Sequence, residues 1–202
     1  DPFSRRVTPN RFPWSTLIPP FGDHSLAGHV WVPIDDHSCW AWSINFRPDR
    51  PLSDEEMADL EAGKGIHCEY EAGTNQPGGT FRPKANKDND YLMDRQAQKD
   101  KRAYSGVFGF AVQDSSLQES MGLIQNLRDE KLLPTDRAIV MARRMLYEAA
   151  TALAQEQADP PALAADKQRV RAAGVLLPRD QDPQDWAAIH LADGKDQPVY
   201  TI

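Results

Sequence analysis

The stretch "GHVWVPIDDHSCWAWSINF", residues 28–46, decides the fold class. Large apolar or aromatic side chains alternate with smaller and polar ones on both sides of residues 35–38. Alternation with a period of two is typical of strands, and turn residues between two such runs predict a hairpin. We therefore expect two antiparallel strands that are joined at Asp35, Asp36, His37 and Ser38.

The segments around the hairpin predict further short elements. The first 27 residues are rich in proline and arginine and are interpreted as an extended loop. Ser53 and Glu56 form a capping box, which predicts a short helix that ends at Gly63. Residues 64–71 are expected to form another strand. The polar stretch 73–90 is too long for a simple connector and indicates a functional lid or a disordered loop.

A third strand is expected over residues 104–113, where apolar residues alternate with small ones. It leads into a helix predicted over about 116–127, with Ser116 and Glu119 as a second capping box. Asp114 stands at the boundary between the two elements. An aspartate in that place has two interpretations, a cap of the helix or a ligand for a positive group.

The longest predicted helix begins at Thr135. Its apolar residues recur at spacings of three and four, which predicts one buried face. They are Ile139, Ala142, Met145, Leu146, Ala149 and Leu153. After residue 160 we expect a short helix over about 164–173, and then a segment, "GVLLPRDQDPQDW", that packs back on the surface.

Hairpins, a sheet and a long C-terminal helix together predict an α+β fold in which the helix lies across an antiparallel sheet. We expect residues 1–159 to be part of one domain and residues 160–202 to form an extension packed on it. A sheet curved around a helix leaves a pocket between the two. The chain begins with "DPFSRRVTPN" rather than methionine, and we expect it to continue a longer protein upstream.

Composition excludes several classes of function. The formal charge of −7 argues against a nucleic-acid-binding surface, which needs a basic stripe. The longest apolar run, "VFGFAV", has six residues and cannot cross a membrane. The two cysteines, Cys39 and Cys68, form no disulfide framework and predict a cytoplasmic protein. Phosphate-binding loops, nucleophile elbows and zinc-protease motifs do not occur.

One short cluster is similar in composition to an iron site. Asp23, His24 and His29 supply two histidines and a carboxylate, which is the ligand set of many non-haem Fe(II) enzymes. The cluster lies in a loop between Pro19-Pro20 and Gly28, where isolated histidines are usually solvated. We therefore do not assign these histidines to a metal.

Four strings of the sequence resemble, in the same order, the C-terminal half of phthalate 4,5-dioxygenase-like Rieske non-haem iron oxygenases. They are "GHVWVPIDDHSCWAWSINFRPDRPL", "NKDNDYLMDRQAQ", "YSGVFGFAVQDSSLQESMG" and "TDRAIVMARRMLYEA". The resemblance covers most of residues 1–157. Its most specific parts are N-D-Y-L-x-D-R-x-x-Q, from Asn89, and Q-D-x-x-x-Q-E-S-M-G, from Gln113.

The resemblance implies a helix-grip catalytic domain whose mononuclear Fe(II) is held by two histidines and one aspartate. Asp114 is the candidate metal ligand and catalytic residue, because the family commonly has an acidic residue five positions later, as Glu119 is here. The resemblance places the two histidines and the [2Fe–2S] Rieske cluster upstream of the matched region. It also implies dioxygen and an aromatic acid as substrates, electrons from NAD(P)H through a reductase, and a homotrimer.

Two functions remain open at this point. The first is an aromatic-ring hydroxylase or O-demethylase, with a substrate pocket expected to include Phe108, Phe110, Val112 and Leu117. Arg5, Arg6 or Arg82 would be available to pair with a substrate carboxylate. The alternative is a non-catalytic helix-grip domain that binds an apolar small molecule, since a fold does not fix a function.

Overall fold

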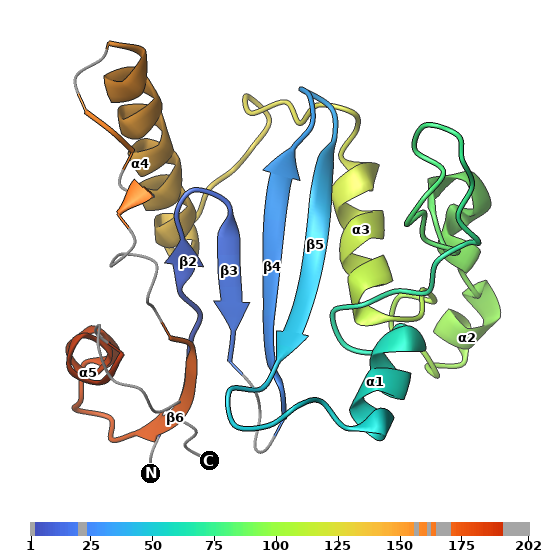
Figure 1. Ribbon diagram of the computed structural model, residues 1–202, viewed down its shortest axis with the longest axis horizontal. Coiled ribbons are helices and arrows are strands. Elements are labelled where there is room, and N and C mark those ends of the chain that lie inside the picture. Colours follow the sequence, from blue (N-terminus) through green and yellow to red (C-terminus); the bar gives the residue numbers. More distant parts are fainter. Residues whose placement is uncertain (1–2, 20–23, 156–157, 161–162, 165–170, 192–202) are drawn as a thin grey trace. The chain divides into compact units, whose positions relative to one another are not determined.

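The computed structural model describes residues 3–19, 24–155, 158–160, 163–164 and 171–191 of the chain (Figure 1). The chain divides into two compact units, one made of residues 1–49 and 126–202 and the other of residues 50–125. Antiparallel strands and helices occur in the first unit, and the second is mainly helical. The predicted α+β class, with antiparallel sheet and a long C-terminal helix, is confirmed.

The predicted hairpin forms one side of a four-stranded antiparallel sheet, in which its second strand is an edge strand (Figure 1). Its strands are β4 (Leu26–Pro33) and β5 (Cys39–Phe46), and β2 (Asn10–Arg11) and β3 (Ser15–Ile18) continue the sheet beyond β4. The Asp35 carboxylate closes the turn by accepting the backbone N–H groups of His37 and Ser38 at 2.8 and 2.7 Å. The sequence therefore predicted both strands and the turn correctly.

One face of β5 is strongly apolar. Side chains alternate between the two faces of a strand, so Trp40, Trp42, Ile44 and Phe46 share a face, and all four are exposed. Val30 lies opposite Trp42 on β4 and continues this face. The sheet thus presents a broad aromatic surface that the described residues do not cover.

The interpretation of the first 27 residues as a loop was wrong, because β1 (Phe3–Val7), β2 and β3 lie there. β1 pairs in antiparallel fashion with β6 (Ala173–Leu177), so two segments far apart in the sequence form a second, two-stranded sheet. The proline and arginine content of this segment favoured a loop, and its short strands form only because they pair with other segments of the chain. Most of the helix expected over 164–173 lies outside the described residues, and Ala173 already belongs to β6.

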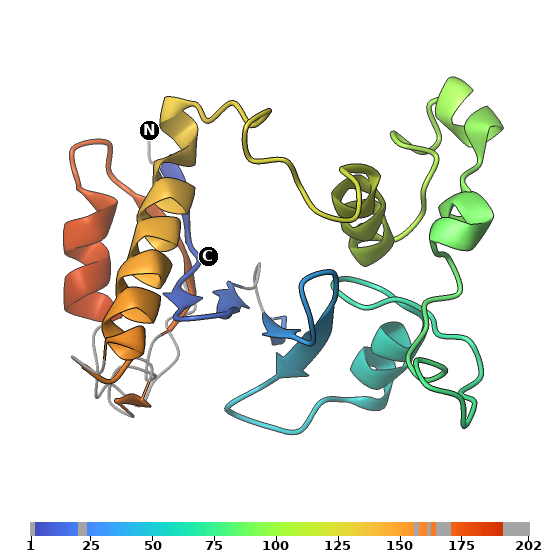
Figure 2. The same cartoon turned by 90° about the horizontal axis from the view of Figure 1, so that it is seen from above.

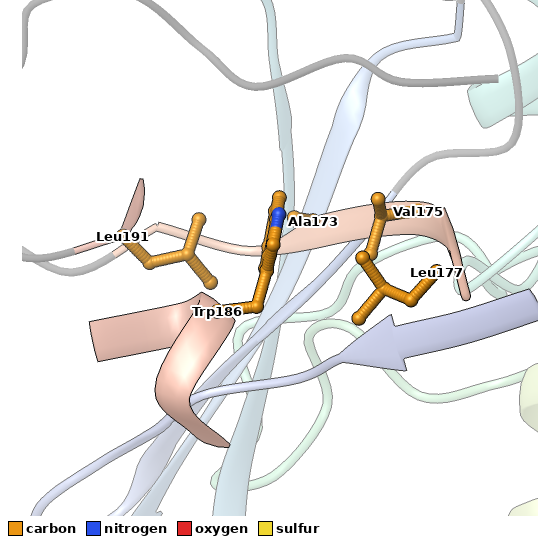
Figure 3. Close-up of a cluster of buried hydrophobic side chains, with 5 residues drawn as sticks. All are labelled: Ala173, Val175, Leu177, Trp186 and Leu191. Carbon is orange, nitrogen blue, oxygen red and sulfur yellow. The ribbon is translucent and has the colours of Figure 1, made fainter. Parts of the chain in front are cut away.

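Helix α5 (Pro183–His190) covers β6 and completes a small hydrophobic core (Figure 3). Buried side chains from β6, from α5 and from the residue after it form this core, namely Ala173, Val175, Leu177, Trp186 and Leu191. The His190 ring also stacks on Trp186, with ring centroids 4.8 Å apart. The segment after residue 170 is therefore anchored to the N-terminal strand, and the expected domain division at residue 160 stays a prediction.

The long helix is α4 (Arg137–Ala154), an unbroken helix preceded by the short helix η2 (Pro134–Asp136) (Figure 2). It begins two residues after the predicted start. Its apolar stripe was predicted to be buried, which is wrong in this structure, since Ile139, Met145, Leu146 and Leu153 are 40–53% exposed. The spacing of apolar residues identifies a face that is suited to burial, but not the element that covers it.

The second unit begins with α1 (Asp54–Glu61), whose capping box of Ser53 and Glu56 is present as predicted. The chain turns at Gly63, whose φ of +73° is in the left-handed region. The strand predicted over 64–71 is wrong, because only an isolated bridge between Tyr70 and Pro83 forms there. The long polar stretch leads into η1 (Lys87–Leu92) and then α2 (Arg95–Lys99).

Helix α3 (Phe110–Ser120) replaces the strand predicted over 104–113, which was wrong. Gly109, with a φ of +87°, is its N-cap, so the helix starts six residues before the predicted position. The Ser116 and Glu119 capping box was also wrong, because both residues lie inside the helix and Ser116 Oγ donates to the Gln113 carbonyl at 2.8 Å. Within the described ranges, the helices are all too short or too polar to span a membrane.

Candidate functional site

Asp114 lies in the second turn of α3, with its side chain exposed. The helix begins four residues earlier, at Phe110, and its N-cap is Gly109, which makes no side-chain capping bond. Asp114 is therefore not a cap, and one of the two interpretations of this residue is excluded. The expectation that it ends a strand is also wrong, since a helix presents the carboxylate instead.

Helix geometry places Asp114 between two apolar side chains. Residues three and four apart share one face of a helix, so Phe110, Asp114 and Leu117 lie in one row. Phe110 is 57% exposed and Leu117 is 68% exposed. We call this row the front face of α3. It combines a carboxylate with apolar surface and is accessible in the described part of the chain.

The four residues expected to line a substrate pocket do not share one surface. Phe110 and Leu117 are on the front face, whereas Val112 points away from it and is only 7% exposed. Phe108 precedes the helix and is exposed. Val112 is buried while the other three side chains are exposed, and the substrate pocket of Phe108, Phe110, Val112 and Leu117 stays a prediction.

Glu119 lies on the opposite side of α3 from Asp114. Successive helical residues are rotated by about 100°, so five positions rotate a side chain by about 140° from its starting direction. Val112 and Glu119 share this side, which we call the back face. The Glu119 carboxylate accepts a hydrogen bond from the Tyr91 hydroxyl of η1, and the two elements are in contact.

Burial, together with the hydrogen bond to Glu119 and the negative charge of that carboxylate, raises the pKa of Tyr91 to about 12. Desolvation disfavours the charged phenolate, and the neighbouring carboxylate repels it. The Tyr91 hydroxyl is therefore a protonated donor at neutral pH. Sequence reasoning missed this residue, although it stands inside the N-D-Y-L-x-D-R-x-x-Q string that carries the resemblance.

The residues of the iron-like cluster, Asp23, His24 and His29, do not form a metal site among the described residues. His29 lies on β4, where its Nδ1 is 3.3 Å from the Ser43 hydroxyl and its ring is 5.2 Å from that of Trp31. His24 is exposed, and Asp23 lies outside the described residues. Across the described ranges, groups of three histidine, cysteine, aspartate or glutamate side chains that could hold a metal ion do not occur.

The arginines considered as partners of a substrate carboxylate have other contacts. Arg82 pairs with Asp88 at 2.7 Å and lies 3.5 Å from Glu71, so it stabilises the loop before η1. The Arg5 guanidinium lies over the ring of Phe3, 4.8 Å from its centroid. Both side chains thus have contacts within the chain, and their pairing with a substrate carboxylate stays a prediction.

The chemistry of the front face fits part of an iron site. A carboxylate is a suitable oxygen ligand for Fe(II), and an exposed Asp114 is available to bind one. A facial site needs two histidines as well, and a group of three potential ligands that includes Asp114 does not occur among the described residues. The front face therefore offers one carboxylate with apolar side chains on both sides of it, and its role as an iron ligand stays a prediction.

The fold places the chain among α+β proteins, and an exposed carboxylate lies on one helix face. Residues 5–196 match the protein family described as LigXa C-terminal domain like. The chain belongs to this family, and its resemblance to the C-terminal catalytic half of phthalate 4,5-dioxygenase-like Rieske oxygenases is confirmed.

Two characterised relatives are oxygenase subunits. The oxygenase subunit of 3-chlorobenzoate-3,4-dioxygenase from Comamonas testosteroni is 32% identical over 157 residues, which cover 74% of this chain and 36% of the relative. The oxygenase subunit of phthalate 4,5-dioxygenase from Pseudomonas putida is 29% identical over 181 residues, or 89% of this chain and 39% of the relative. The chain thus spans less than two fifths of either relative.

Proposed function

We propose that this chain is the C-terminal part of the catalytic domain of an oxygenase that hydroxylates or O-demethylates an aromatic acid. The reaction uses dioxygen at a mononuclear non-haem iron. The observation that carries the proposal is the front face of α3, on which Asp114 is exposed between Phe110 and Leu117. The two relatives are dioxygenase subunits for chlorobenzoate and phthalate, and both compounds named are aromatic acids.

In this proposal Asp114 is one of three protein ligands, and the other two are histidines in the longer protein. Bound iron would supply the centre at which dioxygen is activated beside the substrate. Phe110 and Leu117 flank the carboxylate, and their apolar surface favours an aromatic ring and excludes water from the same side.

The proposal extends to the partners of the longer protein. A Rieske [2Fe–2S] cluster would be held by two cysteines and two histidines of a separate domain and would supply the electrons. They come from NAD(P)H through a reductase. The protein assembles as a homotrimer in the cytoplasm, and the exposed apolar surfaces of β5 and α4 are covered by the remainder of the protein. Surfaces of this extent are rarely left in contact with water.

The test uses the full-length oxygenase with the change Asp114→Ala. We expect the variant to keep the visible absorbance of the Rieske cluster, since another domain holds the cluster. It should lose its mononuclear iron and form no product. Glu55→Ala is the matched control, because Glu55 is also an exposed helical carboxylate of the same unit. That variant should retain iron and turnover.

Two results would overturn the proposal in different ways. Full iron occupancy with normal turnover in Asp114→Ala would show that Asp114 is not a ligand. Absence of stoichiometric iron from the unaltered full-length protein, combined with binding of an apolar small molecule, would favour the non-catalytic alternative. Iron is measured by metal analysis after desalting, and product by chromatography with benzoate and phthalate derivatives as substrates.

A further inference from the structure

The turn that carries Tyr91 has an unusual backbone. Asn86 and Asn89 form a capping box, in which the side chain of Asn89 accepts the N–H of Asn86 at 3.0 Å. The next three residues, Asp90, Tyr91 and Leu92, have φ angles of +52°, +56° and +50°. Residues other than glycine adopt the left-handed region at a free-energy cost, and three in succession persist only where the surroundings impose it.

Hydrogen bonds on both sides hold this turn in place. The Tyr91 N–H donates to the Asn86 carbonyl at 2.8 Å. The Asp94 N–H donates to the Gly106 carbonyl at 2.8 Å, and a Cβ on Gly106 would lie only 2.6 Å from the Asp94 carbonyl oxygen. Gly106 is three residues before the N-cap of α3. The turn is therefore tied to the chain directly before the helix.

The same turn also contacts α3 near its other end. Tyr91 donates to Glu119, which is the last residue but one of the helix, on the back face. The helix is consequently held before its first turn at Gly106 and within its last turn at Glu119. Because Glu119 lies on the back face, its hydrogen bond from Tyr91 restrains the rotation of α3 about its own axis, and this rotation decides where the front face points.

We propose that Tyr91 is a positioning residue, which acts through Glu119 to set the rotation of α3 and so aims Asp114 at the metal. The inference rests on the proposed function, because it assumes that Asp114 is an iron ligand. It gives a physical reason for the spacing between Asp114 and Glu119. Five helical positions place one carboxylate toward the metal and the other toward the support on the opposite side.

The test compares iron retention in variants of the full-length oxygenase. Tyr91→Phe removes only the hydroxyl, and Glu119→Ala removes its acceptor. We expect iron loss to a chelator to become about tenfold faster in both, which is the lower end of the effect of residues that support metal ligands. The double variant should release iron no faster than the single variant that releases it faster, because the two side chains act as a pair.

Two controls separate positioning from general destabilisation. Glu119→Gln keeps an oxygen that accepts from Tyr91, so iron retention should stay close to that of the unaltered protein. Tyr104→Phe removes a hydroxyl from a side chain of the same unit that is 98% exposed, and it should have no effect. A second readout is the electron paramagnetic resonance spectrum of the nitric oxide-treated ferrous protein, which reports ligand geometry and should broaden in Tyr91→Phe.

The outcomes distinguish this inference from the proposed function. If Asp114→Ala loses iron while Tyr91→Phe and Glu119→Ala release it at the unaltered rate, the positioning role is wrong and the ligand assignment stands. If Asp114→Ala retains iron, both are wrong. Unaltered iron release with a lowered melting temperature in Tyr91→Phe would show that the pair is structural only. Release rates are measured well below every variant's melting temperature.

Discussion

The change Asp114→Ala should slightly stabilise helix α3, although it removes the proposed metal ligand. Asp114 is exposed in the second turn, beyond the first turn in which the helix dipole favours a carboxylate. What remains is intrinsic helix propensity, which favours alanine over aspartate by about 0.6 kcal/mol in a helix interior. Since this is about one unit of RT, amide protons that exchange through local opening of α3 should exchange about threefold more slowly.

The assay is hydrogen exchange of the α3 amides, followed by NMR or mass spectrometry in the 202-residue chain. Ser115→Ala is the matched control, because Ser115 is an exposed neighbour whose replacement also raises helix propensity. It should slow exchange by a similar factor without any change of charge. A helix cap would behave in the opposite way, because its removal costs about 0.5–2 kcal/mol. Faster exchange of α3 in Asp114→Ala would therefore refute the placement of Asp114 on an open helix face.

Two further predictions concern the core of β6 and the contact between Tyr91 and Glu119. Leu177→Ala should lower the free energy of unfolding by about 2–5 kcal/mol, measured by urea denaturation, because Leu177 is 3% exposed in the core of Figure 3. Its neighbour Leu176 is 49% exposed, so Leu176→Ala is the control and should cost about 1 kcal/mol or less. Equal losses in the two variants would contradict the packing of β6. The pKa of Tyr91 is raised from 10 to about 12, so its contribution to stability is complete below pH 10 and is lost as the pH rises toward 12. Tyr91→Phe should flatten the stability profile in that window, and an unchanged profile would show that the contact with Glu119 does not form.

Local signals predicted the hairpin and the first helix correctly. In the hairpin, aromatic residues alternate over two strands and Asp35 accepts the backbone of the turn, which are both properties of adjacent residues. The capping box of Ser53 and Glu56 is likewise complete within four residues. Patterns of this kind need no information from distant parts of the chain, so a single sequence is sufficient to read them.

The strand predicted over 104–113 shows where a short apolar run becomes ambiguous. Periodicity cannot distinguish a buried strand from a helix over six residues. The glycines decide the outcome, because Gly106 and Gly109 have φ angles of +76° and +87° and end any extended run before α3 begins. The resemblance to known oxygenases identified Asp114 by its spacing from Glu119, whereas the local pattern assigned it to the wrong element.

Contacts between distant residues were not predictable. β1 and β6 pair across almost the whole chain, from Phe3 to Leu177, and neither strand has a strong pattern of its own. Tyr91 and Glu119 are 28 positions apart, and only the folded turn brings them together. The spacing of apolar residues predicted the stripe of α4. It could not predict that the stripe is exposed, because burial depends on what packs against a helix.

The most direct test of the account is to locate the iron relative to Asp114. An anomalous difference map, recorded at the iron absorption edge from crystals of the full-length oxygenase, shows each iron position separately from the protein. The account predicts a mononuclear iron within direct coordination distance of the Asp114 carboxylate, with Phe110 and Leu117 beside it and Glu119 on the far side of α3. An iron bound by other residues, with the Asp114 carboxylate left in solvent, would contradict it.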